Sequence, residues 1–215
     1  MDSINKYIDH TLLTPEATTN QIYQLCEEAR THKFAAVCIA PTFVKEAFTL
    51  LKDTEVKTCT VVGFPLGSTL SSVKAFETRM AIDQGATEID MVANISALKD
   101  KDWKKYEDDI HSVLEAASGR IVKVIIETCL LTNDEIIKAC QAVLKANAHF
   151  IKTSTGFSKS GATVETVKLI KQTVEDKCLI KASGGIKSYE FASKLISSGA
   201  NRIGTSQGIN LLPKD

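Results

Sequence analysis

The sequence predicts an α/β fold in which eight strand–helix units close into a (β/α)8 barrel. Eight short apolar runs recur along the chain, starting roughly 22 to 34 residues apart. Most of them are continuous rather than alternating, as expected for parallel strands buried on both faces. Amphipathic helical segments separate the runs, and repeated strand–helix units imply parallel strands with right-handed crossovers. Because a count of strands does not prove closure, a doubly wound open sheet is the alternative.

The expected strands follow directly from these runs. In chain order they are Tyr7–Leu12, Ala36–Ala40, Cys59–Phe64, Glu88–Ala93, Ile121–Glu127, His149–Thr153, Leu179–Ala182 and Arg202–Gly204. In a closed barrel, chemistry belongs at the C-terminal ends of the strands. We therefore expect most of the polar residues late in each strand to meet at one mouth, namely Asp9, His10, Cys38, Asp90, Glu127, Thr128, Lys152, Lys181 and Gly204–Ser206.

The segments between the strands carry signals for the start and the end of helices. Thr18–Gln21 and Thr132–Glu135 fit capping boxes, in which side chains satisfy the free N–H groups of a first helical turn. Glycines stand where helices should end, at Gly85, Gly119 and Gly199. No linker, low-complexity run or break in composition divides the chain, so we expect one domain over residues 1–215.

Composition and charge exclude several classes of function. Basic and acidic residues balance at 26 each, so no net charge points to nucleic acid or a membrane surface as a partner. No apolar run reaches the ~18 residues of a membrane-spanning helix, and the N-terminus does not resemble a signal peptide. The six cysteines form no CxxC pair, and the four histidines share no ligand spacing. We expect reduced core thiols, a cytoplasmic location and neither a metal nor another cofactor.

Two lysines in the middle of apolar strands are the main chemical signal. Lys152 follows Phe150 and Ile151, and Lys181 occupies the same position in the next expected strand. A buried lysine without a partner is rare. Attack on a carbonyl needs a neutral amine, which is a small minority for a free lysine with a pKa of about 10.4. Burial and a second cation on a strand about 4.8 Å away both favour that form. Lys152 is thus a candidate nucleophile, and the alternative is a structural ion pair with a carboxylate such as Glu127.

Two carboxylates could move protons in such a site. Asp90 stands between apolar residues in Glu88–Val92, and Glu127 lies at the edge of its strand. Buried acids of this kind act either as proton carriers or as salt-bridge partners. The sequence alone leaves both interpretations open for both residues.

Three strand exits contain glycine and could bind an anion. They are Thr155–Gly156, Ser183–Ile186 and Gly204–Ser206. Glycine lets backbone N–H groups approach a phosphate, and the N-terminus of a following helix adds a favourable dipole. Each exit alone could be an ordinary turn, but phosphate sites after the seventh and eighth strands recur in barrels.

Taken together, these segments resemble the deoxyribose-phosphate aldolase family of class I aldolases. The resemblance covers nearly the whole chain and is carried by Ile8–Leu13, Ala36–Ile39, Val61–Gly67, Gly85–Val92, Val122–Thr128, Phe150–Gly156, Ile180–Ile186 and Arg202–Ser206. The combination of Lys-Thr-Ser-Thr-Gly at 152–156 with Lys-x-x-Gly-Gly at 181–185 is specific to this family.

The resemblance implies a TIM barrel lyase that needs no cofactor and cleaves 2-deoxy-D-ribose 5-phosphate reversibly to D-glyceraldehyde 3-phosphate and acetaldehyde, in deoxyribose catabolism. It assigns Lys152 as the Schiff-base lysine, Lys181 as the second lysine that perturbs it and moves protons, and Asp90 as the acid–base residue. It also implies a homo-oligomer, a dimer or a tetramer. Phosphate contacts fall on Gly156, Gly184, Gly185, Gly204 and Ser206.

Some positions depart from the family pattern. Thr14 stands where many relatives have lysine, Ser96 where many have glycine, and Gln207 where many have a second serine. Gln207 leaves one phosphate hydroxyl in doubt, although its backbone N–H could serve instead. The chain ends at Asp215 without the tyrosine-ended tail of some relatives, which bears on closure over the substrate.

Three rival functions stay open at this point. One is a Schiff-base aldolase for a different phosphosugar, which product identification would separate. Another is a barrel isomerase that uses Asp90 and Glu127 as bases, and the third is a protein that binds phosphosugars without turning them over. The last two predict no covalent adduct at Lys152.

Overall fold

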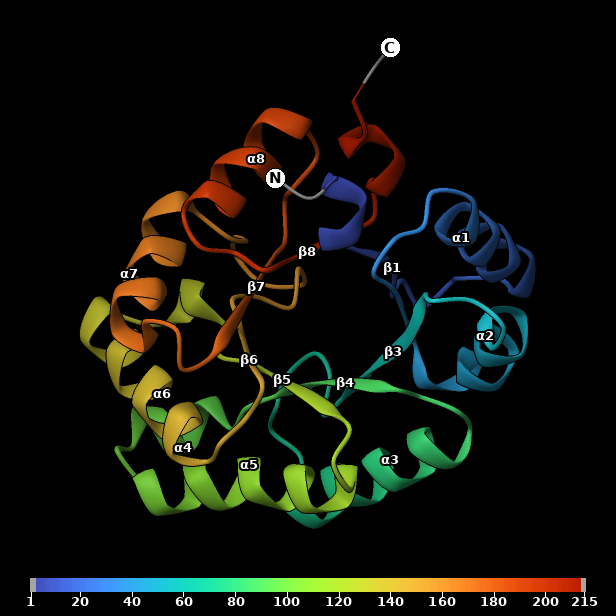
Figure 1. The fold of residues 1–215 in the computed structure, drawn as a ribbon. Coiled ribbons are helices and arrows are strands. Elements are labelled where there is room, and N and C mark those ends of the chain that lie inside the picture. Colours follow the sequence, from blue (N-terminus) through green and yellow to red (C-terminus); the bar gives the residue numbers. More distant parts are fainter. Residues whose placement is uncertain (1–2, 214–215) are drawn as a thin grey trace.

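Within residues 3–213, which the computed structural model describes, eight parallel strands form a closed barrel (Figure 1). Each strand pairs with the next, and the last returns to the first, with Asp9 opposite Gly204. The predicted (β/α)8 barrel is confirmed, and the open-sheet alternative is wrong. The strands are β1 (Ile8–Leu12), β2 (Ala36–Ile39), β3 (Lys57–Val62), β4 (Glu88–Val92), β5 (Ile121–Ile125), β6 (Phe150–Lys152), β7 (Leu179–Ser183) and β8 (Arg202–Thr205).

Helices surround this ring of strands (Figure 1). Both predicted capping boxes are present, at Thr18 and Gln21 before α1 and at Thr132 and Glu135 before α6. The predicted helix-ending glycines have the positive φ angles that favour glycine: 109° at Gly85, 82° at Gly119 and 116° at Gly199. The helices are α1 (Thr19–Thr31), α2 (Val44–Leu51), α3 (Ser71–Asp83), α4 (Ile95–Lys99), α5 (Trp103–Ala117), α6 (Asn133–Lys145), α7 (Val164–Val174) and α8 (Tyr189–Ser197).

Each predicted strand differs from the observed one by one or two residues at one end or both, and two of these differences have a local cause. β1 begins at Ile8 because Ile4–Tyr7 forms a 3-10 turn, η1. β5 stops at Ile125, two residues early, because Glu127 adopts a left-handed φ of 51°. A second 3-10 turn, η3 (Thr128–Leu130), follows directly, so the backbone of Glu127 leaves the strand direction.

Charged side chains fill much of the barrel interior. Each of them is at most 3% exposed: Asp9, Glu88, Asp90, Lys123, Lys152 and Lys181. The small apolar cluster on the same side consists of Ala36, Cys38, Cys59 and Val61, with Leu13 and Phe64 packed against it. The large apolar core joins helix faces to the outer faces of the strands. Hydrophobic stabilisation therefore comes mainly from the outer layer, and the interior is left to polar groups.

A buried ion pair fixes the helices next to β4. Lys74 on α3 lies 2.7 Å from Asp109 on α5, and both side chains are fully buried. The Lys74 ammonium also donates to the carbonyl of Val92 at the end of β4, at 2.8 Å. The pair thus ties two outer helices to a strand end at the mouth.

The domain prediction covered residues 1–215, and four of these, Met1, Asp2, Lys214 and Asp215, lie outside the described residues. Residues 3–213 contribute to one barrel, and the single domain stays a prediction for the whole chain. The six cysteines are free, five of them buried. In the described part, the helices are too short or too polar to cross a membrane.

Candidate active site

A cavity of about 340 Å³ opens at the C-terminal ends of β1, β6, β7 and β8. Lys152 lines it although its side chain is only 3% exposed. The structure also brings every glycine and serine predicted to contact phosphate to the wall of this cavity. They are Gly156, Gly184, Gly185, Gly204 and Ser206.

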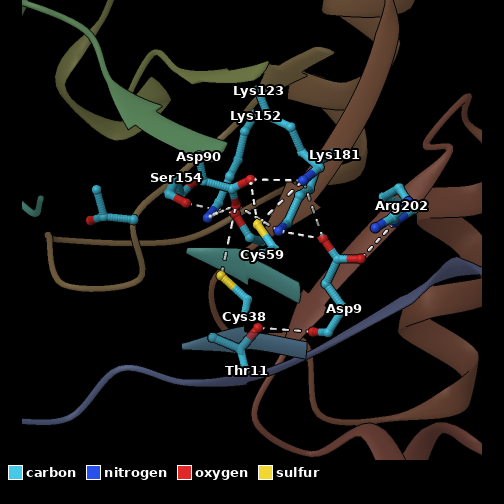
Figure 2. A network of polar contacts seen from close by, with 12 residues as sticks. Asp9, Thr11, Cys38, Cys59, Asp90, Lys123, Lys152, Ser154, Lys181 and Arg202 are labelled. Carbon is cyan, nitrogen blue, oxygen red and sulfur yellow. Dashed lines mark hydrogen bonds and ion pairs between the residues drawn. The ribbon is translucent and has the colours of Figure 1, made fainter. Parts of the chain in front are cut away.

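Lys152 and Lys181 converge on one oxygen of Asp90 (Figure 2). The two lysines are direct register partners on β6 and β7, as their spacing predicted. Their Nζ atoms donate to Asp90 Oδ2 at 2.8 Å and 2.7 Å. The three residues predicted to be catalytic therefore form one contact cluster, with Asp90 contributed by β4.

The carboxylate of Asp90 belongs to a larger ion network that the sequence analysis did not identify. Lys123 on β5 lies 2.9 Å from Asp90 Oδ1 and 2.6 Å from Glu88. Lys181 also pairs with Asp9 at 2.5 Å. Arg202 closes the network by pairing with Asp9 at 2.6 Å (Figure 2). It also pairs with Glu88 at 2.8 Å.

This network has four cationic side chains and three carboxylates among the described residues. A fully ionised network therefore holds one more positive than negative charge. Lys181 and Lys123 each have a second carboxylate besides Asp90, namely Asp9 and Glu88. Lys152 contacts Asp90 alone among the described carboxylates, so it is the amine with the fewest counter-ions.

The surroundings fix the charge states of Asp90 and Lys181. Burial raises the pKa of Asp90, but Lys123, Lys152 and Lys181 outweigh burial and hold that pKa well below its usual range. Burial lowers the pKa of Lys181, but Asp9 and Asp90 outweigh it and raise that pKa far above its usual range. At neutral pH, Asp90 is a carboxylate and Lys181 an ammonium group.

Two thiols complete the surroundings of Asp90. Cys59 lies 3.1 Å from Oδ1 and Cys38 lies 3.9 Å from Oδ2. With Asp90 they form the one group of potential metal ligands found among the described residues. However, ammonium groups already contact both Asp90 oxygens, and Lys123 lies 3.4 Å from the Cys59 sulfur. The donor atoms thus face cations, which is a poor environment for a metal ion.

Glu127 does not reach the lysines. Its carboxylate accepts hydrogen bonds from the backbone N–H of Thr155 at 3.2 and 3.3 Å and from the Thr155 hydroxyl at 2.5 Å. The structural alternative in which Lys152 pairs with Glu127 is therefore wrong, because the carboxylate beside Lys152 is Asp90. His10 pairs instead with Glu28 at 2.7 Å, as expected for a hydrogen-bonded core histidine.

At Gly184 the glycine-rich wall leaves no room for a larger residue. Gly184 and Gly185 have left-handed φ angles of 87° and 75°. A Cβ on Gly184 would lie 2.8 Å from the Cα of Gly161. Lys187 lines the same cavity and is exposed, two residues before α8 begins. Sequence reasoning missed this cation, although its place directly after the Gly-Gly-Ile turn was a usable signal.

Gln207 does not offer the backbone N–H that the sequence analysis considered for phosphate. That N–H donates to the Thr205 hydroxyl at 2.9 Å. The Thr205 hydroxyl in turn donates to the carbonyl of Ile186 at 2.7 Å, which joins the two predicted phosphate loops.

Known proteins match this chain over nearly its full length. Residues 4–213 match the DeoC/LacD family of aldolases. The chain is 55% identical to a deoxyribose-phosphate aldolase of Streptococcus sanguinis over 209 residues, covering 97% of this chain and 95% of the relative. A solved tetrameric deoxyribose phosphate aldolase from Aeropyrum pernix superposes with a TM-score of 0.91 at 31% identity, covering 97% and 88% of the two chains. The structure named QR15, an aldolase, gives 0.95 at 39% identity, covering 98% and 95%.

Proposed function

This chain belongs to the DeoC/LacD family of aldolases, and we propose that it cleaves 2-deoxy-D-ribose 5-phosphate reversibly through a Schiff base on Lys152. One observation supports the choice of this lysine above others. Lys152 lines the cavity, whereas Lys181 and Lys123 are fully buried and do not line it. Their shared carboxylate, Asp90, joins the nucleophile to a permanent cation.

The first step is attack of the neutral Lys152 amine on C1 of the open-chain aldehyde. The resulting carbinolamine loses water and leaves a protonated imine, which acts as an electron sink. Among the three lysines of the network, Lys152 has the fewest carboxylate partners and is the one that lines the cavity. Lys181 keeps its proton and stays beside the reacting amine as an ammonium donor.

The bond that breaks lies between C2 and C3, because its electron pair must move onto the carbon next to the iminium. The C3 hydroxyl loses its proton as C3 becomes the aldehyde of D-glyceraldehyde 3-phosphate. The two-carbon enamine is then protonated at C2, and hydrolysis of the imine frees acetaldehyde and Lys152. Asp90 and Lys181 would move these protons through a water molecule, since a carboxylate and an ammonium group at 2.7 Å form an acceptor–donor pair.

The phosphate of the substrate would lie at the glycine-containing wall of the cavity. Backbone groups of Gly184 and Gly185 and the turn at Gly204–Ser206 form that wall, and Lys187 adds a positive charge. The start of α8 at Tyr189 contributes its helix dipole. Gly156 faces this wall, since a Cβ on it would lie 3.9 Å from the Gly184 Cα.

We further propose that the chain acts in the cytoplasm as a homo-oligomer, a dimer or a tetramer. Six free cysteines suit a reducing compartment. Large apolar side chains are exposed on α2 and α3, among them Phe48, Val73, Phe76 and Met80, and such exposure is typical of an association surface. Light scattering of the purified protein tests this part.

The substrate is tested by product identification. Purified protein should convert 2-deoxy-D-ribose 5-phosphate to acetaldehyde and D-glyceraldehyde 3-phosphate, and Lys152→Met should abolish both products. Release of an isomeric sugar phosphate without acetaldehyde would instead support the isomerase reading. The isomerase alternative fits the geometry less well for two reasons. The neighbouring lysines keep Asp90 ionised, and Glu127 is directed away from these lysines toward Thr155.

A further inference from the structure

Glu127 is a buried carboxylate without a cation. Glu127 is only 3% exposed. No lysine, arginine or histidine among residues 3–213 comes within ion-pair distance of it, in contrast to Asp9, Glu88 and Asp90. Burying an ionised carboxylate is costly unless donors compensate it. Such a residue needs an explanation that the proton transfers at Lys152 do not give.

The donors that compensate Glu127 come from the loop after β6. Thr155 supplies both its backbone N–H and its hydroxyl, the latter at 2.5 Å. The same hydroxyl accepts the backbone N–H of Phe157 at 3.1 Å. Through one side chain, Glu127 therefore fixes the backbone on both sides of Gly156.

The backbone of Glu127 is itself held in an unusual conformation. Its φ of 51° and ψ of 65° are left-handed, which is uncommon for a residue with a side chain. Neighbouring groups keep it there, because the N–H of Ile126 donates to Lys152 and that of Thr128 donates to Thr153. Local strain that the surroundings maintain is found mainly where geometry serves function.

The loop held in this way forms one wall of the catalytic cavity. Thr155, Gly156 and Phe157 line the cavity together with Lys152. Gly156 lies against Gly184 of the opposite loop, where a Cβ on Gly184 would be 3.6 Å from the Gly156 Cα. Any shift of the 155–157 backbone would therefore alter the space between the two glycine-containing loops.

We propose that Glu127 is a positioning residue, which through Thr155 holds residues 155–157 against the glycine-containing wall that receives the phosphate end of the substrate. The inference rests on the proposed function, since it takes a phosphosugar as the occupant. A carboxylate suits this role because it accepts two donors at once, whereas a glutamine would direct its NH₂ group at one of them. Glu127 neither touches Lys152 nor takes part in proton transfer.

The test compares Glu127→Gln with Glu115→Gln, a control on the exposed end of α5. We expect the KM for 2-deoxy-D-ribose 5-phosphate to rise about tenfold in Glu127→Gln, as for a lost charge-assisted hydrogen bond. The KM for unphosphorylated 2-deoxy-D-ribose and the rate at which borohydride traps acetaldehyde on Lys152 should stay within about twofold of wild type. Amide hydrogen exchange at Thr155 and Phe157 should become faster.

Each contrary result has a distinct meaning. An unchanged KM with unchanged exchange would refute the positioning role, and so would a fall in trapping rate with an unchanged KM, because Glu127 would then act on the reacting atoms. Absence of trapping in wild type would refute the proposed function and, with it, this inference. If Glu127→Gln yields little folded protein, Thr155→Val removes the hydroxyl bond with Glu127 in place and must reproduce the faster exchange at Phe157.

Discussion

Replacing Asp90 by asparagine tests whether this carboxylate holds the interior network together. The side chain keeps its shape but loses the charge that faces Lys123 at 2.9 Å, Lys152 at 2.8 Å and Lys181 at 2.7 Å. Removing one partner of a buried ion pair costs about 3–5 kcal/mol. The question is whether one such pair is lost or three.

The structure indicates that only one of the three lysines would be left without a counter-ion. Lys123 retains Glu88 at 2.6 Å, and Lys181 retains Asp9 at 2.5 Å. Lys152 retains no other described carboxylate within ion-pair distance. We therefore expect the free energy of unfolding at pH 7 to fall by about 3–5 kcal/mol rather than by several times that amount.

Urea unfolding followed by circular dichroism measures this difference. Asp108→Asn is the matched control, because its pair with Lys104 is exposed and should contribute nothing measurable. Turnover of 2-deoxy-D-ribose 5-phosphate by Asp90→Asn should fall by about 10²-fold or more, since a proton acceptor is lost. A variant as stable as wild type would refute the view that Asp90 is the central counter-ion.

Two further predictions follow from the same charges. The free energy of unfolding should fall in acid from about pH 4 downward, because the folded-state pKa values of Asp9 and Asp90 are depressed. The stability that these carboxylates contribute is present above their unfolded pKa and is lost as the pH falls through their folded pKa. Urea unfolding at each pH measures this loss, and an acid slope as steep in Asp90→Asn as in wild type would contradict the prediction. Lys187→Met should raise the KM for 2-deoxy-D-ribose 5-phosphate about fivefold and leave the KM for 2-deoxy-D-ribose unchanged. Lys138→Met on α6 is the control. Equal changes in KM for both sugars in steady-state kinetics would show that Lys187 does not contact the phosphate.

The barrel and the reacting centre could be predicted from the sequence because their signals are local. The apolar runs and capping boxes mark each unit, and Lys152 and Lys181 stand out as lysines inside apolar strands. Lys123 is also a lysine in an apolar strand, but it was not singled out because no glycine-containing turn follows its strand. Its partners Glu88 and Asp90 both lie on the neighbouring strand β4, and Asp90 is its direct register partner.

Other features could not be read from the chain because they depend on contacts distant in sequence. Arg202 bridges Asp9, 193 residues away, and only pairing of β8 with β1 brings the two together. The orientation of the Glu127 side chain depends on its left-handed backbone conformation, which the neighbouring sequence does not predict. The phosphate wall was predicted by family resemblance, whereas Lys187 was missed although it directly follows the Gly-Gly-Ile turn.

Lys152 forms the imine in the proposed mechanism, and chemical trapping detects an imine at this side chain. Wild-type protein and Lys152→Met are treated with acetaldehyde and borohydride, and the intact masses and the modified peptide are measured. We expect one ethyl adduct on wild type, located on Lys152, and none on the variant. No adduct on wild type would contradict the Schiff-base mechanism, and an adduct on Lys181 would contradict the assignment of the nucleophile.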